Sequence, residues 1–142
     1  MEEKVIVFNL GDSEYGIKIE EVNAVVSLKD MVILNLPLSE NNNKFIGCVN
    51  IRNTVTSIIS LYEKYGCELV DINHSNNFLI VLHNRLHCGL LVNQLPQTIT
   101  IKKDNIDTSF NNALLTLDEY FDGLINLPAS NRIITLLTFK NL

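Results

Sequence analysis

The sequence predicts a mostly β protein, folded as small barrels or a sandwich. Short runs of β-branched and aromatic residues follow one another at close spacing, and turn-forming residues separate them. Long stretches of helical periodicity are lacking, so short strands must build the core. The chain has 142 residues, 46% hydrophobic and 19% charged, which is enough to bury a core and excludes wholesale disorder.

Charge and cysteine content narrow the classes of function. The net charge is −5 and no segment concentrates Lys or Arg, which argues against nucleic acid or an anionic membrane as a partner. Cys48, Cys67 and Cys88 are widely spaced and form no CxxC pair, as a reducing compartment permits. The N-terminus MEEKVIVF lacks the basic region of a signal peptide, and no run approaches 18 apolar residues. We therefore expect a cytoplasmic protein without direct membrane insertion.

Residues 45–61, FIGCVNIRNTVTSIISL, are predicted to form a central hairpin. Two apolar pieces, 45–51 and 55–59, flank the polar residues Arg52, Asn53 and Thr54, which is typical of two strands joined by a turn. Asn53 adopts positive φ more easily than most residues. Gly47 indicates a bulge or a close backbone approach inside the first strand.

This hairpin has a counterpart later in the chain. The stretch GLINLPASNRIITLL from Gly123 resembles GCVNIRNTVTSIISL from Gly47 at a constant offset, 123 − 47 = 76. The identical pairs are Gly47/Gly123, Asn50/Asn126, Ile58/Ile134 and Leu61/Leu137. Residues 5–8 and 15–19 match 78–81 and 88–92 at an offset of 78 − 5 = 73. The repetition predicts two related β units, approximately 1–72 and 73–142, and leaves open whether they exchange terminal strands.

The remaining elements of the first half follow from local signals. Residues 4–10 and 15–19 flank a Gly-Asp gap typical of a hairpin loop, and 22–28 form a third strand. Residues 30–38 are ambiguous, Pro37 ends any strand there, and 39–44 are a polar loop. After the central hairpin, Ser60 and Glu63 match a capping box and Gly66 suits the C′ position. A short helical turn is therefore predicted at 61–65.

The second half begins after a polar linker at 71–77. Strands are predicted at 78–82 and 86–91 around a two-residue turn at Asn84 and Arg85, with a further strand at 98–101. A polar loop at 103–112 precedes residues 113–120, which fit either a strand or a helical turn. Strands at 124–127 and 132–139 complete the sheet.

No constellation of catalytic residues is present in the sequence, which has no GxSxG, P-loop or GxGxxG motif. His83 and His87 suggest a metal site, but the predicted turn places them on opposite faces, so no metal or cofactor is expected. Paired acids such as Glu20 and Glu21 also point to opposite faces and are read as solvated. Arg52, at the turn of the central hairpin, fits equally an ordinary surface residue and an interaction residue.

At the level of motifs the chain resembles the CheW-like family of bacterial chemotaxis coupling proteins. A series of short motifs runs through nearly the whole chain in the family's order. No single motif is specific to the family, but the series as a whole is. The matching segments are FNLG at 8–11, YGI at 15–17, VNAV at 22–25, GCVNIRN at 47–53, VTSIISL at 55–61 and CGLLVN at 88–93. The resemblance implies two interlocked, SH3-like, five-stranded β-barrel subdomains with a short helix after the central hairpin.

The resemblance also implies a non-enzymatic adaptor without cofactor. Such a protein would join the cytoplasmic tip of a chemoreceptor to the regulatory domain of a CheA-type histidine kinase, and would be recruited to receptor arrays at the membrane. The receptor tip would lie in a groove between the barrels. The partner-binding positions carried over are Val22, Asn23, Val25, Asn50, Ile51, Arg52, Asn53 and Leu95.

The sequence departs from the family pattern at several of its polar positions. Ala24 replaces a Glu that would pair with Arg52, and Asn93 replaces an Asp, so two charges are lost. Asn53 replaces a Gly and Ser57 a Pro. Two other functions stay open: a β module that binds a small molecule or peptide, and a CheW-like adaptor in a pathway other than chemotaxis.

Overall fold

The computed structural model describes residues 1–35, 45–68, 71–84, 86–108 and 119–142, and within them it is mostly β, as predicted. The strands are β1 (Glu2–Leu10), β2 (Ser13–Lys18), β3 (Val22–Ser27), β4 (Ile33–Asn35), β5 (Phe45–Ile51), β6 (Thr54–Ile59), β7 (Phe78–Leu82), β8 (Cys88–Val92), β9 (Gln97–Lys102), β10 (Ile106–Asp107), β11 (Phe121–Leu127) and β12 (Arg132–Leu137). Within the same described ranges, three short 3₁₀ helices accompany them: η1 (Ile19–Glu21), η2 (Lys103–Asn105) and η3 (Pro128–Ser130). The predictions for 39–44 and 113–118 lie outside the described residues.

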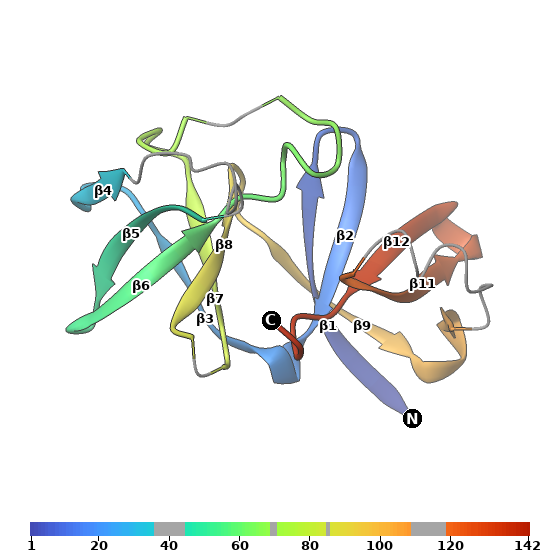
Figure 1. Ribbon diagram of the computed structural model, residues 1–142. Helices are drawn as coiled ribbons and strands as arrows, with labels where there is room; N and C mark the ends of the chain where they lie inside the picture. Colours follow the sequence, from blue (N-terminus) through green and yellow to red (C-terminus); the bar gives the residue numbers. More distant parts are fainter. Residues whose placement is uncertain (36–44, 69–70, 85, 109–118) are drawn as a thin grey trace. The chain divides into compact units, whose positions relative to one another are not determined.

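The chain forms two compact units, each with its own sheet (Figure 1). Unit 1 comprises residues 1–21 and 96–142, and its strands are ordered β10-β11-β12-β2-β1-β9. Unit 2 comprises residues 22–95, with the order β3-β7-β8-β6-β5-β4. The sequence halves 1–72 and 73–142 are therefore not the compact units. The β1–β2 hairpin of the first half belongs to unit 1, where β1 pairs with β9. The β7–β8 hairpin of the second half belongs to unit 2, where β7 pairs with β3.

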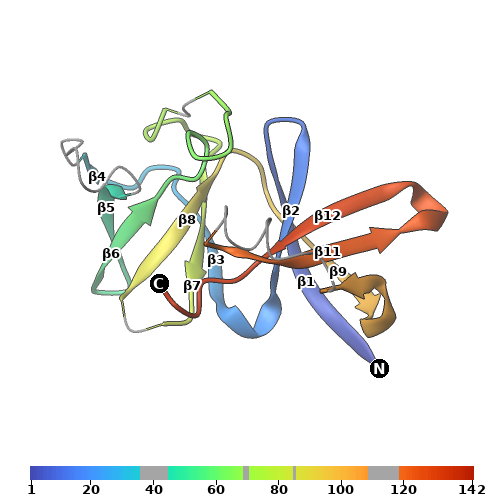
Figure 2. The same ribbon diagram turned by 45° about the vertical axis from the view of Figure 1, so that its right-hand side comes forward.

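The two sheets have the same internal plan. β12 runs parallel to β2 in unit 1 (Figure 2), and β6 runs parallel to β8 in unit 2. In these ladders Leu136 lies opposite Gly16, and Ile58 lies opposite Gly89. Each sheet has five longer strands and one short edge strand, β10 in unit 1 and β4 in unit 2. The presence in one chain of two sheets with the same strand order supports the proposal of a duplication.

The glycines at the start of each hairpin have the role that the sequence indicated. Both ladders shift register there, between Phe45 and Gly47 and between Phe121 and Gly123. A Cβ on Gly47 would lie 2.6 Å from the Leu34 carbonyl oxygen of β4. A Cβ on Gly123 would lie 2.9 Å from the carbonyl oxygen of Asp107 in β10. Only glycine permits this close passage of the edge strand, so the predicted bulge and close approach are both confirmed.

The gapless comparison of the two hairpins is wrong beyond the first strand. β5 and β6 are joined by Arg52 and Asn53, whereas β11 and β12 are joined by residues 128–131, which include η3. The longer connection shifts the second strand, so Ile58 corresponds to Leu136 and not to Ile134. Loops tolerate insertions because a longer loop costs little additional closure entropy.

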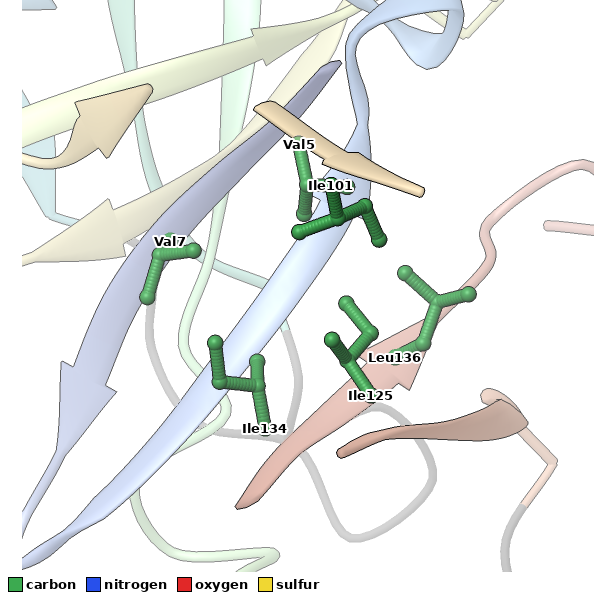
Figure 3. Close-up of a cluster of buried hydrophobic side chains, with 6 residues drawn as sticks. All are labelled: Val5, Val7, Ile101, Ile125, Ile134 and Leu136. Carbon is green, nitrogen blue, oxygen red and sulfur yellow. The ribbon is translucent and has the colours of Figure 1, made fainter. Parts of the chain in front are cut away.

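Each unit has its own apolar cluster beneath its sheet. In unit 1 the cluster comprises Val5, Val7, Ile101, Ile125, Ile134 and Leu136 (Figure 3). In unit 2 it comprises Leu28, Val49, Ile58, Leu79 and Leu91. Fully burying one such side chain contributes about 1.5–3 kcal/mol. Strand β1, from the first half of the chain, contributes Val5 and Val7 to the core of unit 1. Strand β7, from the second half, contributes Leu79 to the core of unit 2.

The segment after the central hairpin forms one helical turn, closed as predicted at its C-terminal end. Tyr65 N–H donates to Leu61 O, Cys67 N–H donates to Tyr62 O, and Gly66 N–H donates to Glu63 O. Gly66 has φ 73°, which is the geometry of a Schellman motif. The capping box is not formed, because no bond joins Ser60 and Glu63 among the described residues. Ser60 is instead buried.

Candidate functional site

A pocket of about 490 Å³ lies within unit 2 at the end of the β5–β6 hairpin. Three parts of the unit contribute its walls: the hairpin turn, strand β3 and the connection between β7 and β8. The lining residues are Asn23, Ala24, Ile51, Arg52, Thr54, Thr56, Val81, Leu82, His83, Asn84 and His87.

The hairpin turn places Arg52 at the rim. Ile51 pairs with Thr54, so Arg52 and Asn53 alone form the connection, with φ values of 50° and 65°. Positive φ at both central residues is typical of a type I′ turn, whose twist matches that of the flanking strands. The predicted turn is confirmed, although Thr54 already belongs to β6. Arg52 is exposed at this turn and lines the pocket.

Strand β3 brings two further residues to the pocket through an irregularity in its ladder. Val22 pairs with Leu82 and Ala24 pairs with Val81, so Asn23 is the extra residue of a bulge. A bulge redirects side chains locally. Asn23 and Ala24 consequently both line the pocket.

The connection between β7 and β8 differs from the sequence prediction. Val81 lies opposite Gly89 and Ile80 opposite Leu90. Continued toward the connection, this register sets His83 across from His87, and both histidines line the pocket. The prediction that they point to opposite faces was therefore wrong, because a slip of one residue reverses the face of every side chain on a strand.

Local bonding explains this longer connection. The side-chain Oδ1 of Asn84 accepts the N–H of Leu86 at 3.0 Å, which closes a turn through the side chain. His87 then adopts a left-handed φ of 47°, and its carbonyl accepts the N–H of Ser57 at 2.9 Å. A left-handed residue is common near the end of a hairpin connection, but its sequence signal is weaker when that residue is not a glycine.

One buried hydroxyl of the pocket is already hydrogen-bonded. Thr56 is buried, and its hydroxyl donates to the carbonyl of Thr54 at 3.2 Å. Ile51, Val81 and Leu82 supply apolar wall next to this hydroxyl. A pocket with apolar walls and a few convergent polar groups is the usual form of a binding site.

The electrostatics of the pocket are one-sided. Among the described lining residues there is one arginine and there are two histidines, but no Asp or Glu. Arg52 is exposed and forms no ion pair with any described residue. Across the described part of the chain no group of three or more His, Cys, Asp or Glu could hold a metal ion.

The structure brings together only part of the predicted partner-binding set. Asn23, Ile51 and Arg52 line the pocket, whereas Val22, Val25, Asn50, Asn53 and Leu95 do not. Asn53 is exposed at the turn, and Asn50 lies opposite Val55 on the outer side of the hairpin. Leu95 is 66% exposed beyond the end of β8. His83, Asn84 and His87 were missed as site residues because the predicted register separated them.

Asn93, one of the departures from the family pattern, has a structural contact. Its N–H donates to the Tyr62 hydroxyl at 3.0 Å, and this hydroxyl donates to its Oδ1 at 3.1 Å. Burial raises the pKa of the Tyr62 hydroxyl above its usual 10.0, although the bond from Asn93 opposes this rise. Tyr62 and Asn93 thus tie the helical turn after β6 to the end of β8.

Comparison with known proteins identifies the family. The sequence pattern described as "CheW-like domain" matches residues 4–142. The chain belongs to the CheW-like domain family. It is 33% identical over 102 residues to the chemotaxis protein CheW of Helicobacter pylori, and 23% identical over 107 residues to that of Bacillus subtilis. These matches cover 72% and 75% of this chain, and 59% and 66% of those proteins' lengths.

The fold agrees with a solved CheW-like structure. The crystal structure of the scaffolding protein TtCheW from Thermoanaerobacter tengcongensis matches with a TM-score of 0.74 at 23% sequence identity. The match covers 98% of this chain and 90% of that one, and it confirms the predicted fold class. No helix among the described residues is long and apolar enough to cross a membrane.

Proposed function

We propose that this protein is a non-catalytic adaptor of bacterial chemotaxis that acts in the cytoplasm. It would couple the cytoplasmic tip of a chemoreceptor to the regulatory domain of a CheA-type histidine kinase. The observation that carries the proposal is the match of the CheW-like family pattern to residues 4–142. The relatives named chemotaxis protein CheW and the structure named as a scaffolding protein support the same role.

The receptor-binding surface is proposed to include the end of the β5–β6 hairpin. Arg52 is its central residue, since it is exposed, stands at a turn and has no ion-pair partner among the described residues. A guanidinium group offers five donors in a planar fork that fits a carboxylate on a partner. Asn23 and Ile51 lie beside it at the pocket, and Val22, Val25, Asn50, Asn53 and Leu95 complete the proposed set.

Binding measurements on purified protein test the proposal. Titration calorimetry with a receptor cytoplasmic-tip fragment and with the kinase regulatory domain should show saturable binding of both. Arg52→Ala should weaken binding of the receptor fragment by roughly tenfold, as expected for loss of a charged hydrogen bond. Lys29→Ala is the matched control, because Lys29 is also an exposed cation of unit 2 but does not line the pocket. Wild-type protein that binds neither partner would refute the proposal.

The pocket supports a second candidate, a module that binds a small molecule. Its volume of about 490 Å³ lies within the range of ordinary ligand sites. Saturable binding of a small ligand together with failure to bind receptor and kinase fragments would favour this candidate over the adaptor.

A further inference from the structure

We propose that the pocket of unit 2 binds an anionic group, a carboxylate or a phosphate, held by Arg52, His83 and His87. The proposal deepens the proposed function and rests on it for one point, namely that a partner protein carries the group. Three features support such a site: the charge of the pocket, the absence of a described partner for Arg52, and the Arg132–Glu14 pair of unit 1.

The charge of the pocket is opposite to that of the protein. The chain carries 16 Asp and Glu residues against 11 Lys and Arg, for a net charge of −5. The pocket's described lining nevertheless contains no carboxylate, while it contains one arginine and two histidines. A site of positive potential on an acidic protein selects anions locally, because nearby charges dominate over distant screened ones.

Several donors at the pocket have no partner among the described residues. The Arg52 guanidinium makes no described ion pair or hydrogen bond, and the Asn23 side chain likewise makes none. The Thr54 backbone carbonyl accepts the Thr56 hydroxyl, but the Thr54 hydroxyl makes no bond within the described chain. Arginine, amide and hydroxyl donors around one space are suited to the acceptor oxygens of a carboxylate or phosphate.

Unit 1 shows what such a site holds when the chain supplies its own anion. There Arg132 binds Glu14, with Nε–Oε2 at 3.0 Å and Nη2–Oε1 at 2.6 Å. Arg132 begins β12, and Glu14 lies opposite Ile134 in the parallel ladder. The ion pair therefore joins β12 of the hairpin to β2, the strand that runs parallel to it.

The corresponding positions in unit 2 carry different residues. Counting back from the pairs Leu136–Gly16 and Ile58–Gly89, Arg132 corresponds to Thr54 and Glu14 corresponds to His87. The arginine of unit 2, Arg52, precedes Thr54 by two residues, in the shorter turn. Unit 2 thus keeps an arginine at this end of the sheet but lacks the internal carboxylate, which an external anion can replace.

A cation is a poorer occupant of the same pocket. Two imidazoles are fewer ligands than the four that a structural zinc site requires, and Arg52 repels a cation. The charged or titratable lining residues are Arg52 from the turn, His83 after β7 and His87 before β8; β3 and β6 contribute only uncharged residues.

Imidazole NMR on the full chain tests the proposal directly. The chain has three histidines, and His74 is a built-in reference, because it does not line the pocket and its Nδ1 accepts the N–H of Asn76. The probes are sodium phosphate and N-acetylglutamate amide, each against sodium chloride at matched ionic strength. We expect saturable shifts of His83 and His87 and no shift of His74. Shifts equal to those in chloride, or equal shifts of all three histidines, would overturn the proposal.

Two variants separate the pocket from its surroundings. Arg52→Ala should weaken binding of either probe by at least about tenfold. Ala24→Glu should abolish it by placing a carboxylate in the pocket, and the Lys29→Ala control should bind as wild type. Unchanged binding by both pocket variants, with wild-type-like spectra that show them folded, would refute the site.

The receptor-tip fragment distinguishes failure of the site from failure of the adaptor function. If the probes bind but the fragment does not, the anion site stands and the proposed function fails. If the fragment binds wild type, Arg52→Ala and Ala24→Glu equally while the probes do not bind, the adaptor stands and the anion site fails. Binding of phosphate without the glutamate probe would assign the site to a free phosphate and refute a carboxylate from a partner.

Discussion

Unit 1 holds the end of its β11–β12 hairpin with the Arg132–Glu14 pair, whereas the corresponding end of unit 2 is an open pocket with Arg52 at its rim. The strand order and the parallel ladder are the same in both units, so the fold itself does not decide whether this end is closed. What decides is the partner of the arginine. A charged residue whose internal partner exists in one unit and is missing from the other is a candidate for an external contact.

A second difference lies just beyond the same strands. In unit 2 the buried Tyr62 hydroxyl bonds to Asn93. Counted along the same ladders, the matching residues in unit 1 are Lys140 and Glu20, an exposed ion pair at 3.7 Å. These matching positions thus carry a part-buried neutral bond in unit 2 and solvated charges in unit 1. Next to them in unit 1, Glu21 is buried, contrary to the prediction that it is solvated, and its Oε1 accepts the N–H of Phe139 at 2.8 Å. Exposed pairs contribute little to stability, so the Tyr62–Asn93 bonds should contribute more than the Lys140–Glu20 pair.

The largest effect is expected for glycines in the two parallel ladders. A Cβ on Gly89 would lie 2.6 Å from Leu79 Cγ and 2.9 Å from the Ile80 carbonyl oxygen. A Cβ on Gly16 would lie 2.7 Å from a Val5 methyl group, with the nearest backbone oxygen at 3.6 Å. Gly89→Ala should cost about 1–3 kcal/mol of unfolding free energy, and Gly16→Ala less, because side chains yield more easily than backbone. Urea unfolding of both variants checks this; an equal or larger loss for Gly16→Ala would contradict it.

Next in size is Tyr62→Phe, expected to cost about 1 kcal/mol at neutral pH through its lost hydrogen bonds. Since burial raises the pKa of the Tyr62 hydroxyl, the folded state favours the neutral form. Its contribution is present in full below pH 10 and is lost as the pH rises through the folded-state pKa. The variant should therefore lose less stability than wild type as the pH rises above about 10. Glu20→Gln is the control from unit 1, and an equal cost for both would remove the contrast between the units.

A smaller loss is expected when the ion pair of unit 1 is broken. The Glu14 carboxylate raises the pKa of Arg132 through its hydrogen bonds, and both side chains are about one-third exposed. Glu14→Gln should therefore cost roughly 0.2–1 kcal/mol, and less at high salt. Thermal unfolding at low and high salt measures this; a cost that does not depend on salt would show that packing, rather than charge, holds this hairpin end.

The smallest effect on stability is expected for Arg52→Ala, within about 0.5 kcal/mol of wild type. Arg52 is exposed and has no ion-pair partner among the described residues, so its removal breaks no described ion pair. Melting temperature and receptor-fragment affinity are measured on the same sample. A clear drop in melting temperature would mean that Arg52 has a structural role, as Arg132 does.

Local features of the sequence determined the strands and the central turn. Short apolar runs predicted strands close to β1, β2, β3 and β5, because each residue's preference for a pleated strand acts locally. Asn53 predicted positive φ, and Gly47 predicted the bulge, because both effects arise within a few residues. Of the pocket residues, Asn23, Ile51 and Arg52 were identified through the resemblance to the CheW-like family.

The tertiary structure decided which strands share a sheet and which side chains share a pocket. Besides pairing with its neighbour β2, β1 pairs with β9 of the other half. Nothing within β1 indicates this second partner, because such pairing depends on long-range contacts. His83 and His87 meet only because the connection between them is one residue longer than predicted, which reverses the face of the side chains. The sequence therefore determined the elements and the turn at Arg52, while long-range pairing and a one-residue change in register assembled the site.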